Sequence, residues 1–138
     1  METQTSVLVA DDHENILHLF KDIFKKTNYR IFLASNGMEA LETAIKHKVD
    51  LAYLDVKMPI MDGLETLAQW KQIQPATQIV MISAYNDEKL VQKAIEQGAF
   101  TYLFKPINIV DIYAITFQCL KNIGVEPAAD TLDFPGLV

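Results

Sequence analysis

Five polar residues of types that handle phosphate each follow a short apolar run of the chain. Asp11, Asp12 and Asp55 are carboxylates, Ser83 supplies a hydroxyl and Lys105 an ammonium group. Clustered carboxylates repel one another, and a hard divalent cation such as Mg²⁺, which takes carboxylate, water and phosphate oxygens, relieves that repulsion. A cation and a lysine together would neutralise a phosphoryl group while a carboxylate attacks it in line. The set therefore predicts phosphoryl chemistry, provided that the fold brings these residues together.

The elements that would position these residues are short apolar runs that alternate with helical patterns, five times over. The predicted strands cover residues 7–10, 31–33, 51–54, 79–82 and 102–104, and the helical patterns cover residues 16–24, 41–45, 64–73, 90–95 and 113–120. The runs are continuous, which is typical of parallel strands covered on both faces. This order predicts an α/β fold, a doubly wound (βα)5 five-stranded parallel sheet with helices on both faces. Ligands bind at the carboxyl ends of such strands, where all five residues would meet.

Helix starts are marked by capping residues that stand three positions before an acid. The pairs are Asn36 with Glu39, Asp62 with Glu65, and Asn108 with Asp111. In this spacing the first side chain accepts from a free backbone N–H of the first helical turn. The dipeptide Asn36-Gly37 could instead form a hairpin turn, but the helical pattern after it favours a helix. A single Asp after a strand is more often a cap or turn residue than a ligand, so only the joint occurrence of the five residues carries the prediction.

Composition limits the functions open to this chain. Its 138 residues are half hydrophobic and carry a net charge of −6 with one arginine, Arg30, which argues against a direct nucleic-acid binder or a binder of anionic membranes. A single cysteine, Cys119, excludes an intramolecular disulfide and suits a reducing compartment. No run approaches the ~18 apolar residues of a membrane span, and the start lacks a signal-peptide pattern. We therefore expect a soluble, cytoplasmic protein with one domain over residues 5–123 and a tail or start of a linker over residues 124–138.

Four sequence motifs resemble the receiver domain of two-component response regulators. They read V-L-V-A-D-D, L-A-Y-L-D-V-K-M-P-I-M-D-G, V-M-I-S-A and G-A-F-T-Y-L-F-K-P, and the resemblance covers about residues 5–123. It implies the flavodoxin-like strand order 2-1-3-4-5 of the chemotaxis regulator. Lys57, two positions after Asp55, is more similar to sporulation phosphorelay receivers than to chemotaxis receivers.

The resemblance also implies roles for the acidic residues. Asp55 would accept a phosphoryl group from the phosphohistidine of a histidine kinase or a histidine phosphotransfer protein. Asp12 and Asp55 would ligate Mg²⁺, with Asp11 acting largely through a metal-bound water and Lys57 contributing its backbone carbonyl. The chain would then be a phosphorylation-activated switch, and not an enzyme beyond its own phosphorylation and dephosphorylation.

The same resemblance implies how phosphorylation would be signalled. Ser83 and Lys105 would contact the phosphoryl group, the Lys105–Pro106 bond would be cis, and Tyr102 would be the aromatic switch. A downstream protein or output domain would bind the surface of the fourth helix, fifth strand and fifth helix, which carries Val91, Phe100 and Ile109. Ser83 replaces the threonine of many members, so the hydroxyl is kept and a methyl that restricts its rotamer is lost. Lys57 and Tyr85 occupy variable positions that influence phosphate lifetime in the family.

Two other functions stay open at this point. A Mg²⁺-dependent phosphatase-like hydrolase can use an Asp nucleophile on a similar sheet, but it generally needs a second acid where this chain has Lys57. A degenerate receiver could act as a binding scaffold, although all five site residues are present.

Other residues are predicted to have structural roles only. Mg²⁺ prefers oxygen, so His13 is expected to be a solvated loop residue and not a ligand. Cys119 is expected to be half-buried packing, and Trp70 to lie on a helix surface or pack at an edge.

Overall fold

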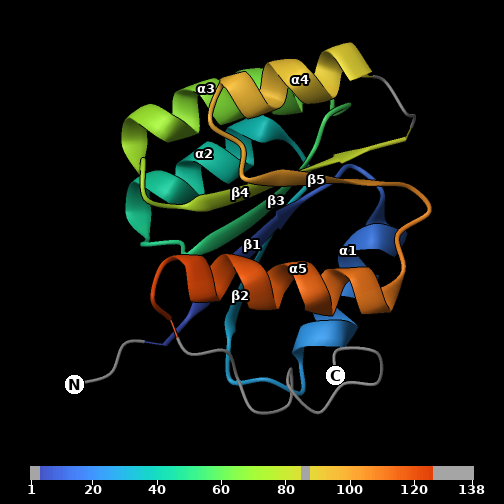
Figure 1. Ribbon diagram of the computed structural model, residues 1–138, viewed down its shortest axis with the longest axis vertical. Coiled ribbons are helices and arrows are strands. Elements are labelled where there is room, and N and C mark those ends of the chain that lie inside the picture. The colour runs from blue at the N-terminus through green and yellow to red at the C-terminus, as the bar shows by residue number, and fades with distance from the viewer. Residues whose placement is uncertain (1–3, 85–87, 126–138) are drawn as a thin grey trace.

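The computed structural model describes residues 4–84 and 88–125 and forms one parallel sheet flanked by helices (Figure 1). The elements in chain order are β1 (Ser6–Ala10), α1 (Glu14–Phe24), β2 (Arg30–Ala34), α2 (Gly37–Lys46), β3 (Leu51–Asp55), α3 (Gly63–Ile73), β4 (Gln78–Ser83), α4 (Glu88–Glu96), β5 (Thr101–Phe104) and α5 (Ile109–Asn122). The strand order is β2-β1-β3-β4-β5 and every pairing is parallel. The predicted (βα)5 fold and strand order are confirmed.

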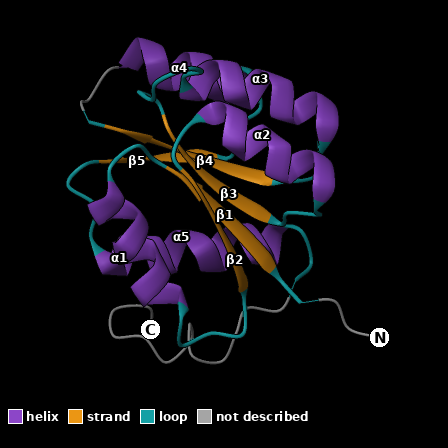
Figure 2. Ribbon diagram, turned by 180° about the vertical axis from the view of Figure 1, so that it is seen from behind, coloured by secondary structure: helices purple, strands orange, loops and turns teal. Residues whose placement is uncertain are grey.

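The helices form two layers, with α2, α3 and α4 on one face of the sheet and α1 and α5 on the other (Figures 1 and 2). Each layer encloses its own apolar core, because alternate residues of the central strands point to opposite faces. Leu8, Leu54 and Met81 face the first layer, and Val9 and Tyr53 face the second. No helix within the described residues is long and apolar enough to span a membrane.

The central strands are buried on both faces, as the sequence predicts, but the edge strands of the sheet are not. All residues of β1 and β3 are buried, whereas β2 and β5 each have one buried residue and are otherwise half-buried or exposed. Leu33 is 40% exposed and Tyr102 is 37% exposed. The expectation of full cover was therefore wrong for β2 and β5, because an edge strand has only one neighbouring strand and the helices do not extend fully over it.

The three predicted caps are confirmed, since Asn36, Asp62 and Asn108 each accept from the backbone N–H three residues later. The hairpin alternative at Asn36-Gly37 is wrong, because α2 begins there.

Two packing predictions were also wrong. Trp70 is fully buried, because its helix α3 lies in the same layer as α2 and α4 and packs into their shared core (Figure 2). Cys119 is fully buried on the sheet side of α5, and burial raises the pKa of its thiol to about 12. By contrast, Ile45, Ile73 and Ile95 of the predicted helical patterns are exposed.

Candidate functional site

The carboxyl ends of four strands bring the predicted site residues to one edge of the sheet. Asp55 and Ser83 are the last residues of β3 and β4, Asp11 follows β1, and Lys105 follows β5. Backbone hydrogen bonds continue the strand pairing into these positions: Asp11 N–H donates to Ala34 (3.0 Å) and Lys105 N–H donates to Ser83 (2.8 Å). The convergence expected from the sequence is therefore present.

The Lys105 ammonium group lies between two buried carboxylates. Its Nζ is 3.2 Å from Asp55 Oδ2 and 3.3 Å from Asp11 Oδ2, and Asp11 and Asp55 are 0% and 3% exposed. Among the described residues, buried Asp11 Oδ2 has this ion pair but accepts no hydrogen bond. Asp12, on the solvent side, adds a third carboxylate. Lys105 thus pairs with two of the three clustered carboxylates, so negative charge predominates in the cluster.

The pKa values express this imbalance. Burial, and after it the nearby Asp11 charge, raise the pKa of Asp55 to about 6, because the opposing attraction of Lys105 is too weak to cancel both. Burial alone would lower the pKa of Lys105, but attraction to Asp55 and Asp11 outweighs it and the net pKa is raised. Asp55 thus resists ionisation while Lys105 stays charged. A further cation would favour the ionised form of Asp55.

A pocket beside Asp55 has room for a small anionic group. It has a volume of about 140 Å³ and is lined by His13, Asp55, Val56, Lys57, Ser83, Ala84, Leu90 and Lys105. The lining includes the carboxylate, the hydroxyl residue and the lysine that the sequence singled out, together with apolar walls. Ser83 is buried there, and the Lys105–Pro106 bond is cis, as the resemblance implies.

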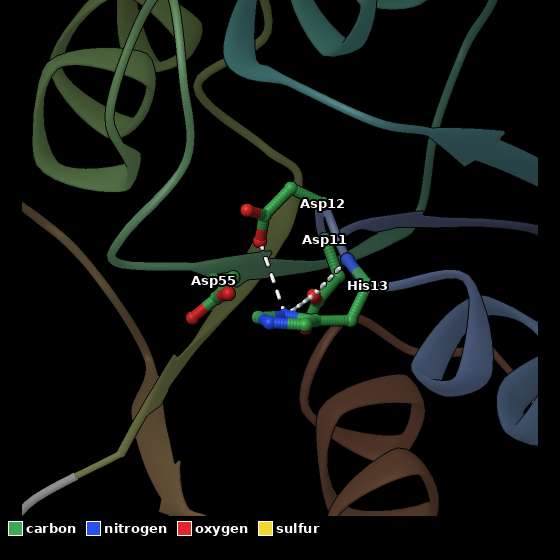
Figure 3. Close-up of side chains that lie close together, drawn as sticks. All are labelled: Asp11, Asp12, His13 and Asp55. Carbon is green, nitrogen blue, oxygen red and sulfur yellow. Dashed lines mark hydrogen bonds and ion pairs between the residues drawn. The ribbon is translucent and has the colours of Figure 1, made fainter.

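His13 lies inside the acidic cluster (Figure 3). Its Nδ1 is 3.0 Å from Asp11 Oδ1 and 3.2 Å from Asp12 Oδ1, and the Asp11 oxygen also accepts from the His13 backbone N–H at 2.8 Å. The imidazole is largely exposed, as expected for a solvated loop residue, but its position against both acids was not expected. Alternation of strands and helices gives no signal for that contact, because it depends on how the chain turns between β1 and α1.

The loop from β3 to α3 fixes the backbone on the other side of the site. Val56 N–H donates to Ile82 and Gly63 N–H donates to Val56, both at 2.8 Å. A Cβ on Gly63 would overlap the Asp55 carbonyl oxygen and come within 2.8 Å of Val56 Cα. Gly63 therefore lets the start of α3 lie directly against the backbone of Asp55. Its part in placing the site cannot be read from residue type alone.

The predicted signalling residues lie on or next to α4, β5 and α5, and Phe100 precedes β5 at the end of the strand opposite to Lys105. Tyr102 is on the edge strand with its ring partly exposed and its centroid 5.0 Å from that of Phe104. Phe100 and Ile109 are exposed and Val91 is half-buried. Tyr85 lies outside the described residues.

Comparison with known proteins places this arrangement in a family. The model of the response regulator receiver domain matches residues 7–116. The chain belongs to this family. Sporulation initiation phosphotransferase F of Bacillus subtilis is 37% identical over 106 residues, which cover 77% of this chain and 86% of that protein. Chemotaxis protein CheY of the same organism is 36% identical, over 74% of this chain and 86% of its own length.

Further relatives and solved structures agree with this assignment. The transcriptional regulatory protein ZraR of Klebsiella oxytoca is 33% identical over 93% of this chain, which spans only 29% of that longer protein. A CheY-like receiver domain structure from Methanospirillum hungatei has a TM-score of 0.84 at 25% identity and covers 88% of this chain and 98% of its own. The Borrelia burgdorferi CheX–CheY–BeF3–Mg²⁺ complex has a TM-score of 0.77 at 28% identity, covering 88% and 90% of the two chains. The protein is thus a receiver domain of a two-component system, homologous to phosphoacceptor domains.

Proposed function

We propose that Asp55 accepts a phosphoryl group from a phosphohistidine of a histidine kinase or a histidine phosphotransfer protein. An Asp55 carboxylate oxygen attacks phosphorus, the P–N bond breaks, and the imidazole nitrogen keeps the electron pair and takes up a proton. Hydrolysis of the acyl phosphate later returns the carboxylate and inorganic phosphate. The observation that carries the proposal is the Lys105 ammonium group, 3.2 Å from the Asp55 carboxylate at the mouth of a pocket that also holds Ser83.

The donor set fits a hard divalent cation, and we propose Mg²⁺. Asp11, Asp12 and Asp55 would supply carboxylate oxygens, and in the part of the chain that the structure describes the buried Asp11 Oδ2 has an ion pair with Lys105 but no hydrogen bond. The Lys57 backbone carbonyl is proposed as a further ligand. When bound, Mg²⁺ would supply positive charge for the phosphoryl oxygens and for the ionised form of Asp55.

Lys105 and Ser83 would stabilise the phosphoryl group on Asp55. Lys105 already contacts the Asp55 carboxylate, so it can neutralise the charge that develops on the phosphoryl oxygens. Ser83 would donate its hydroxyl to a phosphoryl oxygen, a charge-assisted bond worth about 1.5–3 kcal/mol. At ~1.4 kcal/mol per decade, that bond would shift a two-state equilibrium by roughly 10- to 100-fold.

Movement of Ser83 would be passed to Tyr102 and the output surface. Ser83 and Tyr102 lie on adjacent strands, with Met81 paired to Tyr102 and Ser83 paired to Phe104. An inward turn of the Tyr102 ring would remodel the surface formed by α4, β5 and α5, where a downstream protein or output domain would bind. Support comes from the partial exposure of Tyr102, Phe100 and Ile109 on or next to β5 and α5.

The remaining proposals concern the setting of this reaction. The domain would comprise residues 5–123, with residues 124–138 forming a tail or a linker. It would work in the cytoplasm, where phosphohistidine donors are available, and bind neither nucleic acid nor membrane directly. Its only catalysis would be its own phosphorylation and dephosphorylation.

Intact-mass spectrometry tests the proposal after incubation with acetyl phosphate and Mg²⁺. We expect one phosphoryl adduct that hydroxylamine removes, and loss of most of it in Asp55→Asn, because an amide is a poor nucleophile. Asp62→Asn is the matched control: the side chain is exposed, caps α3 and remains a capping type. Normal labelling of Asp55→Asn would refute Asp55 as the acceptor.

A further inference from the structure

We propose that His13 Nδ1 is a ligand of the metal site formed with Asp11, Asp12 and Asp55, and that it biases this site toward first-row transition cations. The inference rests on the metal site of the proposed function and adds a ligand from this chain. It departs from the sequence-based expectation that His13 is a solvated residue without a ligand role.

The distances in the cluster match those of a coordination shell. Metal–oxygen and metal–nitrogen bonds of about 2.1 Å place neighbouring ligands of an octahedral ion about 3.0 Å apart and opposite ligands about 4.2 Å apart. His13 Nδ1 lies 3.0 Å from Asp11 Oδ1 and 3.2 Å from Asp12 Oδ1, which suits neighbouring ligands. One possible ligand atom from each of the four residues lies within 4.8 Å of the other three. This limit exceeds the distance of about 4.2 Å between opposite ligands of one ion by only about half an ångström.

The surroundings of the cluster support the same assignment. Asp11 divides its carboxylate between two neighbours, with Oδ1 toward His13 and Oδ2 toward Lys105. Oδ2 is buried and, within the described residues, has the ion pair with Lys105 but no hydrogen bond, so this carboxylate keeps an oxygen lone pair for a cation while Oδ1 lies beside the imidazole. The His13 ring is 65% exposed, so it can make the small rotation that closes the shell without disturbing the core. Figure 3 shows the ring between the aspartates that follow β1 and the Asp55 side chain.

Ligand chemistry predicts which cations gain from this arrangement. A cation bound at Nδ1 would take the place of a hydrogen on that nitrogen, and the imidazole would bind it as the neutral tautomer with its proton on Nε2. Mg²⁺ takes oxygen ligands and gains little from imidazole, whereas affinity for nitrogen rises from Mn²⁺ through Co²⁺ to Ni²⁺. The contribution of His13 should therefore grow along the series Mg²⁺, Mn²⁺, Co²⁺, Ni²⁺.

Titration calorimetry of the full chain, free of any histidine tag and at one fixed pH, tests this series. His13→Gln should weaken Mg²⁺ binding less than about twofold and Ni²⁺ binding about tenfold or more, with Mn²⁺ and Co²⁺ between them. His18→Gln is the matched control, because His18 is an exposed histidine of α1 that is not in the cluster. His13→Ala should give the same order, which separates loss of the imidazole from a gain by the glutamine oxygen.

Electron spin-echo spectroscopy of bound Mn²⁺ supplies a direct readout of nitrogen ligation. We expect ¹⁴N modulation in the wild type and in His18→Gln, and its loss in His13→Gln. Absence of the modulation in the wild type, or an equal loss of Mg²⁺ and Ni²⁺ affinity in His13→Gln, would overturn the His13 assignment. Failure of the wild type to bind any of the four cations would instead overturn the metal site itself, and with it the proposed function.

Discussion

Replacing Asp55 by asparagine should stabilise the metal-free protein at neutral pH. The buried carboxylate has a pKa of about 6 instead of the 3.8 of an unperturbed aspartate, first because of burial and then because of Asp11. Below both values the group is protonated in the folded and the unfolded chain, and it contributes nothing. As the pH rises through 3.8 the unfolded chain releases the proton while the folded protein retains it, so stability falls with pH. Above about pH 6 Asp55 is ionised in both the folded and the unfolded chain, and the loss of unfolding free energy that it causes stays constant.

The size of the effect follows from the two pKa values. At about 1.4 kcal/mol for each pH unit between them, ionised Asp55 lowers the free energy of unfolding by about 3 kcal/mol at pH 7.5 and by about 0.5 kcal/mol at pH 4. Asp55→Asn should remove this deficit, because the amide stays neutral. For a domain of this length, 2–3 kcal/mol corresponds to a rise in melting temperature of roughly 7–10 °C.

Urea unfolding with a metal chelator present, at pH 4 and at pH 7.5, measures the predicted difference. Asp62→Asn is the control, since it removes one negative charge from an exposed cap and should change stability by less than ~0.5 kcal/mol at either pH. Added Mg²⁺ should then reduce the difference in unfolding free energy between Asp55→Asn and the wild type. Mg²⁺ stabilises the wild type by RT ln(1 + [Mg²⁺]/Kd) and binds the variant less well. An Asp55→Asn variant no more stable than the wild type at pH 7.5 would refute the argument from uncompensated charge.

Three further predictions concern the residues around Asp55. Lys105→Met leaves two buried carboxylates without their cation and should cost about 3 kcal/mol at pH 7.5, and less at pH 5, by urea unfolding; an equal loss at both pH values would contradict it. Ile60 is 79% exposed at φ 71°, so Ile60→Gly should raise the unfolding free energy by up to ~1 kcal/mol, whereas Ile45→Gly in α2 should lower it. Gly63→Ala places a Cβ against the Asp55 backbone and should cost about 2 kcal/mol or more in thermal melts and slow labelling by acetyl phosphate; unchanged labelling would contradict the contact.

The placement of the candidate site residues could be predicted from sequence, because it depends on local pattern and on one rule of topology. Asp55 and Ser83 end continuous apolar runs, and parallel strands place such ends along one edge of the sheet. The cap at Asp62 needs only a side chain three residues before a free N–H. Neither inference requires knowledge of which helix packs on which.

What could not be predicted depends on contacts between distant elements. Trp70 is buried because α3 packs into the core shared by α2 and α4, and nothing in its own helical pattern marks that position as central. Tyr102 and Leu33 belong to continuous apolar runs, and the runs themselves do not show that these two side chains are partly exposed on the edge strands β5 and β2. The contact of His13 with Asp11 depends on backbone angles between β1 and α1, which residue types do not fix.

The charge imbalance that destabilises the fold is also what makes the pocket reactive. With a pKa of about 6, Asp55 is ionised in about ten of every eleven molecules at pH 7, so it is a nucleophile before any cation binds. Full compensation of its charge by a second lysine would stabilise the apo protein, but the same charge would compete with a metal ion and with the phosphoryl group for the carboxylates. Lys105 lowers the pKa of Asp55 enough to keep the nucleophile ionised at pH 7, and the neighbouring carboxylates leave negative charge for a ligand to neutralise. Substitutions that relieve the repulsion should therefore raise stability and lower phosphorylation together.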